Sequence, residues 1–411
     1  MEVRKKFLES GGEKPVEECV SSSSSEQNVA LDEEQAGRIA RFVEMDAKSG
    51  GPLALLSSDA RVEEVAVIGP GKPVFVYLAG KGWLATPCIF TDLSALTNAI
   101  NKLAKPLGRR VTAKKPRLNA VLENGCRIHA SIPPVSGGEV TIRRFRSEPF
   151  SPADLISTKT FSAEAAAFLW LAVQSDASIL IAGNTGSGKT STLNALFSFI
   201  PLSERILLVE ETPELRIPHP HSCRLVARDE LGIGLGELSA DSLRMRPDRV
   251  VIGEARDKGE VRALFDSMLS GQARGSYATV HARDSRDAIA RLSSIGISES
   301  DLLALDLIVI QRREAAFKAG KFFEERRCTE ICEVGFPAPE RLFSFERKTG
   351  SLSMKSLGKR AAEKICATFG FDETGLSREV SRRAAFLSSL AERKPGFSDC
   401  LREIGGFDGS P

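Results

Sequence analysis

A glycine-rich segment between an apolar run and a helical pattern constrains this chain more than any other feature. Residues 177–200 read ASILIAGNTGSGKTSTLNALFSFI, so a run typical of a buried strand is followed by G-x-x-x-x-G-K-[ST] and then by a helix. In this pattern the glycines let backbone N–H groups turn towards phosphate oxygens, and the amino end of the helix contributes positive charge. The segment therefore predicts a cradle for the phosphates of a nucleotide.

The residues of this cradle have separate expected roles. Lys189 should reach the β- and γ-phosphates, and Thr190 should ligate Mg²⁺. Motors, kinases, GTPases and recombinases share such a segment, but the N-K-x-D motif typical of GTPases does not follow it in this sequence. The full set of predicted nucleotide-binding residues here is Gly183, Asn184, Thr185, Gly186, Ser187, Gly188, Lys189, Thr190 and Ser191.

Two further apolar runs end in carboxylates. RILLVEETPEL (205–215) leads to Glu214, and DRVVIGEAR (248–256) leads to Glu254. The carboxyl ends of parallel strands meet at the crevice where ligands bind in open α/β sheets. We expect Glu254 to hold Mg²⁺ through its water shell and to position water, and Glu214 to orient or activate the attacking water. The structural alternative is that these carboxylates cap the helices that follow the strands.

A third strand-like run, ARGSYATVHARDS (273–285), contains His281 near its end. A histidine at this place either makes a structural hydrogen bond or senses the γ-phosphate and passes that state to a neighbouring element. The residues alone leave both interpretations open.

Composition indicates a globular protein that can bury a large core. Of the 411 residues, 42% are hydrophobic and 27% are charged, and the net charge of +2 gives no support for a nucleic-acid partner. The eight cysteines are dispersed, which favours free thiols in a reducing cytoplasm. Since no run reaches the ~18–20 apolar residues of a spanning helix, we expect any membrane association to be peripheral.

Composition and periodicity divide the chain into five parts. Residues 1–30 are polar and include a run of serines, so a disordered tail is predicted. A small α+β domain is expected over 31–145, and the proline-containing segment 146–160 is predicted to be a linker and hinge. Alternating strand and helix patterns over 161–335 predict a parallel sheet with crossover helices. Residues 336–411 are expected to form a hairpin and a helical tail.

Four ordered segments resemble a known family. GNTGSGKT (183–190), VEETPEL (209–215), LRMRPDRVVIGEAR (243–256) and GSYATVHA (275–282) are similar to the Walker A, Asp box, Walker B and His box of the type II/type IV secretion ATPases. Flanking segments resemble the tight-adherence and type IV secretion branch and the archaeal pilus and archaellum motors. The resemblance implies a RecA-like P-loop ATPase domain with a mostly parallel sheet and flanking helices, preceded by a smaller α+β domain and followed by a helical tail.

The resemblance also assigns roles by position. Glu214 matches the catalytic Asp-box glutamate, Glu254 the Walker B glutamate and His281 the His-box histidine. Further nucleotide contacts are implied for Arg244 and Arg246, near the nucleotide or a subunit boundary, and for Arg127 and Arg143, which reach the phosphates when the two domains close. The sequence departs from the family at Glu211, where an Asp is usual, and at Gln272, where a His is usual.

The function implied by the resemblance is that of an ATP-hydrolysing, Mg²⁺-dependent homo-hexameric motor. It would lie in the cytoplasm at the inner face of the cell membrane and drive a polytopic membrane platform protein, so that a type IV pilus-like filament is assembled or a cargo is secreted. No direct contact with nucleic acid is expected. One alternative is a DNA-handling ATPase of the recombinase or translocase type, which salt-sensitive, DNA-stimulated hydrolysis would reveal. Another is a nucleotide-gated assembly scaffold with little turnover.

Overall fold

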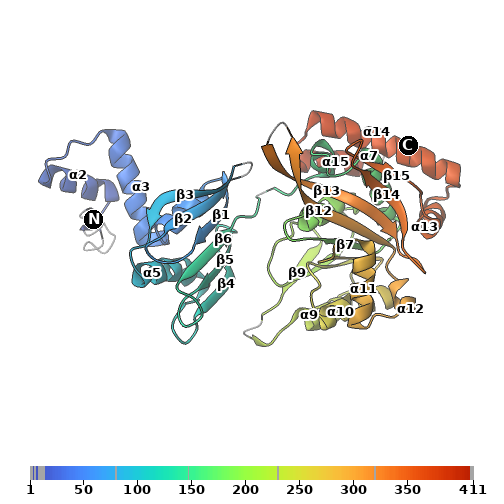
Figure 1. Ribbon diagram of the computed structural model, residues 1–411, viewed down its shortest axis with the longest axis horizontal. Coiled ribbons are helices and arrows are strands. Elements are labelled where there is room, and N and C mark those ends of the chain that lie inside the picture. Colours follow the sequence, from blue (N-terminus) through green and yellow to red (C-terminus); the bar gives the residue numbers. More distant parts are fainter. Residues whose placement is uncertain are drawn as a thin grey trace. The chain divides into compact units, whose positions relative to one another are not determined.

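The chain divides into two units, Met1–Arg146 and Ser147–Pro411. The computed structural model in Figure 1 describes residues 3, 6–7, 14–78, 81–146, 148–228, 231–318 and 321–407, with side chains described except at 44–49 and 316–323. In this part of the chain, the helices lack the combination of length and apolar character needed to span a bilayer.

The first unit is built on an antiparallel sheet of six strands in the order β3-β2-β1-β6-β5-β4. Burial alternates along β1, so one face of the sheet points to a core. Helix α5 (Leu93–Ala104) covers this face and buries Leu96 and Ile100 against Val65 and Ile142. This is the small α+β arrangement expected from the sequence. Its remaining elements are α4 (Pro52–Ser58), β1 (Val62–Val67), β2 (Pro73–Leu78), β3 (Gly82–Ile89), η1 (Lys105–Leu107), β4 (Arg117–Val121), β5 (Arg127–Ser131) and β6 (Glu139–Arg143).

A helix lies within residues 1–30, where the sequence analysis predicts a disordered tail. Helix α2 (Val16–Glu26) buries Cys19 and Val20 against α3 (Glu33–Ser49). The apolar residues that make this contact have helical spacing, but the serine run beside them dominates the composition and hides the pattern. The remainder of the expected tail at residues 1–2, 4–5 and 8–13 lies outside the described residues.

The second unit contains a nine-stranded sheet in the order β15-β14-β13-β12-β7-β11-β10-β8-β9. Pairing is parallel from β12 through β7, β11, β10 and β8 to β9, and antiparallel from β12 to β15. The central strands are buried along their whole length, as strands covered on both faces must be. The strands are β7 (Ile179–Gly183), β8 (Ile206–Glu210), β9 (Ser222–Val226), β10 (Arg249–Ile252), β11 (Gly275–Val280), β12 (Leu307–Lys318), β13 (Lys321–Glu333), β14 (Glu340–Glu346) and β15 (Ser351–Met354).

Helices cover both faces of this sheet (Figure 1). Ile179 and Ile181 of β7 belong to one apolar core, and Leu180 and Ala182 belong to the other, because successive side chains of a strand point to opposite faces. The structure confirms the mostly parallel α/β fold with flanking helices. On the first face lie α6 (Pro152–Ser157), α7 (Ala163–Gln174), η2 (Phe197–Phe199), α13 (Lys359–Phe369), α14 (Glu373–Arg393) and α15 (Phe397–Phe407); on the second lie α10 (Lys258–Leu269), α11 (Ser285–Ile295) and α12 (Glu299–Leu302), with α9 (Leu235–Leu243) beside α10.

Two of the expected segments are built into this unit more closely than the sequence suggests. The expected linker 146–160 contains α6, which a capping box of Ser151 and Asp154 begins and which packs against α14. The expected carboxyl-terminal part, 336–411, supplies β14 and β15 to the main sheet and three helices to its core. Both segments contribute buried apolar side chains to the core of the second unit, so they fold as parts of that unit.

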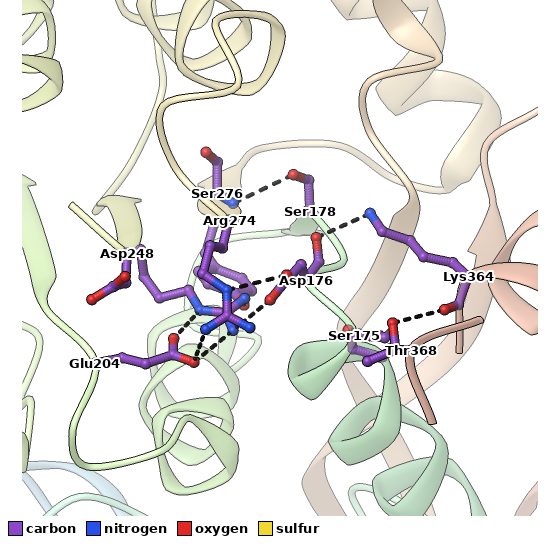
Figure 2. Close-up of polar contacts among 12 residues, drawn as sticks. Ser175, Asp176, Ser178, Glu204, Asp248, Arg274, Ser276, Lys364 and Thr368 are labelled. Carbon is purple, nitrogen blue, oxygen red and sulfur yellow. Dashed lines mark hydrogen bonds and ion pairs between the residues drawn. The ribbon is translucent and has the colours of Figure 1, made fainter. Parts of the chain in front are cut away.

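A network of ion pairs surrounds the amino ends of the parallel strands (Figure 2). Arg249, the first residue of β10, is fully buried and pairs with Glu204 and with Asp176, the latter at 2.8 Å. Arg274, immediately before β11, lies 3.0 Å from Glu204 and 3.2 Å from Asp176. From α13, the Nζ of Lys364 donates to the carbonyl oxygen of Asp176 at 3.0 Å. Asp176 precedes β7 and Glu204 precedes β8, so the network joins the amino ends of β7, β8, β10 and β11 and connects α13 to them.

Removing Arg249 should destabilise this unit strongly. Arg249→Met leaves two carboxylates without their buried cation, which typically costs about 3–5 kcal/mol of unfolding free energy. The measurement is urea unfolding followed by the fluorescence of Trp170, which is buried in the same unit. The matched control is Arg262→Ala, which breaks a half-exposed pair with Asp266 and should cost less than about 1 kcal/mol. Equal losses in the two variants would contradict this account of the network.

Candidate functional site

The predicted cradle, here called the phosphate loop (residues 183–190), connects the end of β7 to α8 (Lys189–Leu196). Gly186 and Gly188 have φ values of +72° and +101°, which L side chains rarely adopt. At Gly183 an added Cβ would lie 2.1 Å from the carbonyl oxygen of Gln311, so the neighbouring strand leaves no room for a side chain. The three glycines are therefore required by the shape of the loop itself.

Lys189 folds back over this loop. Its Nζ donates to the carbonyl oxygens of Gly183 at 3.1 Å and Asn184 at 3.4 Å, and lies 3.5 Å from Nδ1 of His281. The side chain is 8% exposed, so the ammonium group sits at the inner side of the turn. The other predicted residues of the segment follow the same turn: Asn184 and Thr185 are exposed, Ser187 is buried, and Thr190 and Ser191 are half-buried in the first turn of α8.

Glu254 and His281 meet next to Lys189. Glu254 follows β10 by two residues and His281 directly follows β11, so in-register parallel pairing of these strands sets the two side chains at one edge. Oε1 of Glu254 lies 2.6 Å from Nε2 of His281, and Oε2 accepts from Nη2 of Arg256 at 2.7 Å. The imidazole consequently bridges Lys189 and Glu254, with one ring nitrogen facing each.

Opposing effects set the charge of Glu254. Burial favours the neutral carboxyl, but the hydrogen bond and charge of Arg256, together with the charges of His281 and Lys189, lower the pKa of Glu254 below its ordinary value. Arg256 also pairs with Glu211, and although burial opposes its charge, these carboxylates raise the pKa of Arg256. The site therefore keeps Glu254 ionised, as a carboxylate that is to hold Mg²⁺ must be.

The segment after β8 is organised by Glu210 rather than by Glu214. Glu210 is buried, and its Oε1 accepts from the backbone N–H groups of Glu214 and Leu215, both at 2.9 Å. Burial raises the pKa of Glu210, which these hydrogen bonds and the nearby Arg224 oppose. Glu214 itself is half-buried in the loop that follows the strand. Its backbone is thereby fixed at the same edge of the sheet, while its role on an attacking water stays a prediction.

Of the other predicted arginines, the two in the second unit are not part of this cluster. Arg244 and Arg246 are exposed and precede β10, so they lie at the amino edge of the sheet, opposite the phosphate loop. Arg244 pairs with Asp241 at 3.3 Å. Arg127 and Arg143 belong to the first unit, where they face each other directly on β5 and β6.

The sequence analysis missed three basic residues at the site. Arg256 joins Glu211 to Glu254; its place two residues after Glu254 in the same run was the available signal. Arg313 and Arg326 come from β12 and β13 and contact the phosphate loop. They are far from the loop in sequence, and the arginine-rich runs in which they occur read as ordinary charged hairpin strands.

The donors at this edge fit a nucleotide with Mg²⁺. The loop offers backbone N–H groups at a helix amino end, and Lys189 adds a cation beside them. Mg²⁺ commonly takes one or two protein oxygens and completes its shell with phosphates and waters. The hydroxyl of Thr190 and the ionised carboxylate of Glu254 are oxygens of that kind on the elements that bound the loop.

The fold and this loop together define a P-loop nucleotide-binding protein of the RecA-like class. The family model described as "Type II/IV secretion system protein" matches residues 47–343, and the chain belongs to this family.

Comparison with individual proteins gives the following similarities. The type IV secretion system protein VirB11 of Bartonella henselae is 31% identical over 294 residues, which cover 61% of this chain and 80% of that protein. An uncharacterized protein of Methanocaldococcus jannaschii is 35% identical over 269 residues, 62% of this chain but 37% of that protein, so the chain spans well under two thirds of that relative. The crystal structure of the pilus retraction motor PilT with bound ADP has a TM-score of 0.49 and 16% identity, covering 85% of this chain and 93% of that one.

The lowered pKa of Glu254 predicts that part of the stability is lost in acid. Because the folded-state pKa lies below the ordinary value of 4.5, the stabilisation is complete above that value and disappears as the pH falls through the folded-state pKa. Glu254→Gln should therefore weaken the decline of the unfolding free energy between about pH 5 and pH 3, measured by urea unfolding across that range.

A second variant separates the charge contacts from the carboxylate itself. Arg256→Ala keeps Glu254 but removes the guanidinium that lowers its pKa, so it should weaken the same acid decline. An acid decline as steep as that of the wild type in both variants would contradict these contacts.

Proposed function

We propose that this chain is an ATP-hydrolysing motor that works as a homo-hexamer. It powers the assembly of a type IV pilus-like filament, or secretion, through a polytopic membrane platform protein, and it lies in the cytoplasm at the inner face of the membrane. The observation that carries the proposal is the contact chain Lys189–His281–Glu254 beside the phosphate loop. Membership of the secretion family supports the motor role.

In the proposed cycle each group at this edge has one task. Lys189 and the loop N–H groups bind the β- and γ-phosphates, and Thr190 and Glu254 hold Mg²⁺. The bound Mg²⁺ supplies positive charge that neutralises the charge developing on the phosphates. Glu214 orients the attacking water from the loop after β8. These groups act by positioning the reactants and by electrostatic stabilisation, which are the main sources of catalysis in phosphoryl-transfer enzymes.

His281 is proposed to sense the nucleotide. Its ring lies between Lys189 and Glu254, and the carbonyl oxygen of His281 accepts from Arg291 of α11 at 3.2 Å. A change of charge at the phosphates therefore reaches the imidazole through two groups that touch nucleotide or metal, and reaches α11 through the backbone. Of the two interpretations left open by the sequence, this geometry favours the sensing role.

The roles proposed for the remaining predicted residues rest on the resemblance to the secretion ATPase family. Arg127 and Arg143 are proposed to contact phosphates when the two units close, and the start of the second unit, around 146–160, is the proposed hinge. Arg244 and Arg246 are exposed on the amino edge of the sheet, where a neighbouring subunit of the hexamer would contact them. We propose no nucleic-acid partner.

Single substitutions at the site test the enzymatic part of the proposal. Lys189→Ala and Glu254→Gln should each lower the rate of phosphate release from MgATP by about 10²–10³-fold, because each removes a preorganised charge from the reacting phosphates. Nucleotide binding should weaken in Lys189→Ala and persist in Glu254→Gln. The rates are measured with the full chain at saturating MgATP.

Matched controls keep the test specific. Lys359→Ala and Glu392→Gln make the same chemical changes at exposed positions of α13 and α14, and both should retain the wild-type rate. Wild-type rates in both site variants would refute the proposed assignment of catalytic residues.

A further inference from the structure

The hairpin of β12 and β13 extends past the end of the strand that carries the phosphate loop (Figure 1). Pairing between β12 and β7 ends at Gln311 opposite Gly183, whereas β12 continues to Lys318 and stays paired with β13. The amide of Gln311 is fully buried and donates to the hydroxyl of Thr192 in α8 at 2.8 Å. The hairpin is therefore anchored to both the strand and the helix that bound the loop.

One face of this extension contacts the phosphate loop through two arginines. Nε of Arg326 donates to the carbonyl oxygen of Gly186 at 2.9 Å. The backbone N–H of Arg313 donates to Oδ1 of Asn184 at 3.1 Å, and Nδ2 of Asn184 donates back to the carbonyl oxygen of Arg313 at 3.4 Å. A Cβ added to Gly186 would lie 3.1 Å from Nη1 of Arg313, so this guanidinium lies directly against the turn.

The two arginines occupy a pair of positions that is unfavourable in an ordinary hairpin. Arg313 and Arg326 are directly opposite each other in the antiparallel register, a position where like charges destabilise a hairpin. Glu324 pairs with Arg313 and offsets one of the two charges. Lys189 also contacts the loop, through the carbonyl oxygens of Gly183 and Asn184, so three basic side chains lie against the turn.

The charged side chains on the other face of the same hairpin have different partners. There Arg312 and Arg327 lie opposite each other, and Glu314 and Glu325 lie opposite each other one step further along. Arg327 pairs with Glu325 at 2.5 Å, and Arg312 and Arg347 lie 3.9 Å and 3.5 Å from Glu314. Among the described residues of this hairpin, the arginines that contact the phosphate loop are thus Arg313 and Arg326.

An anion in the loop accounts for this arrangement. A guanidinium has five N–H donors in a planar fork that matches phosphate oxygens. The described hydrogen bond of Arg326 uses Nε, which leaves the Nη groups for another acceptor. We propose that Arg313 and Arg326 bind the phosphate tail of the nucleotide held by the loop, so that the β12–β13 hairpin is a second phosphate-binding element. This inference rests on the proposed function, because it takes a nucleoside triphosphate as the ligand.

The test compares phosphate affinity across variants of the full chain. Calorimetric titrations with MgATP and with inorganic triphosphate are made on the wild type, Arg313→Ala and Arg326→Ala. Each variant should bind both ligands roughly 10- to 100-fold more weakly, the usual effect of losing a charge-assisted hydrogen bond. Thermal unfolding of each variant is recorded alongside, and Arg313→Gln or Arg326→Gln replaces any alanine variant that does not fold.

Arg347→Ala is the matched control. Arg347 is exposed and lies 3.5 Å from Glu314 on the other face of the hairpin, so this variant removes one guanidinium without touching the loop. It should bind both ligands as the wild type does. Equal weakening in Arg347→Ala and Arg326→Ala would overturn the inference, because the effect would then be one of overall charge.

A conservative variant separates binding from mere support of the loop. Arg326→Lys keeps the cation and should recover much of the affinity for inorganic triphosphate; affinity as low as that of Arg326→Ala would overturn the inference. If the wild type binds neither MgATP nor inorganic triphosphate, the proposed ATPase function and the hairpin inference both fail. If the wild type binds both and the two alanine variants bind equally well, the hairpin inference alone fails and the ATPase proposal stands.

Discussion

Parallel, in-register pairing of β7, β11 and β10 is the constraint on which the site depends. Because these strands run in the same direction, the phosphate loop, His281 and Glu254 all emerge at one edge of the sheet. The strands are buried on both faces, so their ends cannot shift without disturbing two apolar cores. The short contacts from Lys189 through His281 to Glu254 follow from this register.

The same strands carry a different kind of chemistry at their opposite ends. Arg249 begins β10 inside a buried ion network, and Glu254 follows β10 at the site. At the amino edge Arg249 and Arg274 are matched by Glu204 and Asp176 within the unit, which suits a permanent structural role. At the carboxyl edge Lys189, Arg313 and Arg326 contact the phosphate loop, where they could face the negative charge of a bound triphosphate. One sheet thus separates the part that holds the strands together from the part proposed to react.

Local sequence predicted the phosphate loop and its flanking elements well, because strand, glycines, lysine and helix are contiguous and their pattern has a direct physical meaning. The α/β fold with its helical tail was likewise readable from alternating periodicity. The sequence did not reveal Arg313 and Arg326, whose contacts with the loop depend on a long-range strand pairing that no local pattern encodes. Nor did it reveal helix α2 or the place of α6, since both are stabilised by contacts with neighbouring helices. Arg244 shows a different limit. Its distinctive local motif predicted a role near the nucleotide or a subunit boundary, but did not reveal that Arg244 lies at the amino edge of the sheet.

The most direct test is an experimental structure of the full chain with Mg²⁺ and a non-hydrolysable ATP analogue. The account predicts that the triphosphate lies in the 183–190 loop, with Thr190 and Glu254 on the metal side and His281 beside the γ-phosphate. A nucleotide bound elsewhere, or one bound in the loop with Glu254 and His281 turned away from it, would contradict the central claim that these strand ends act together on one triphosphate.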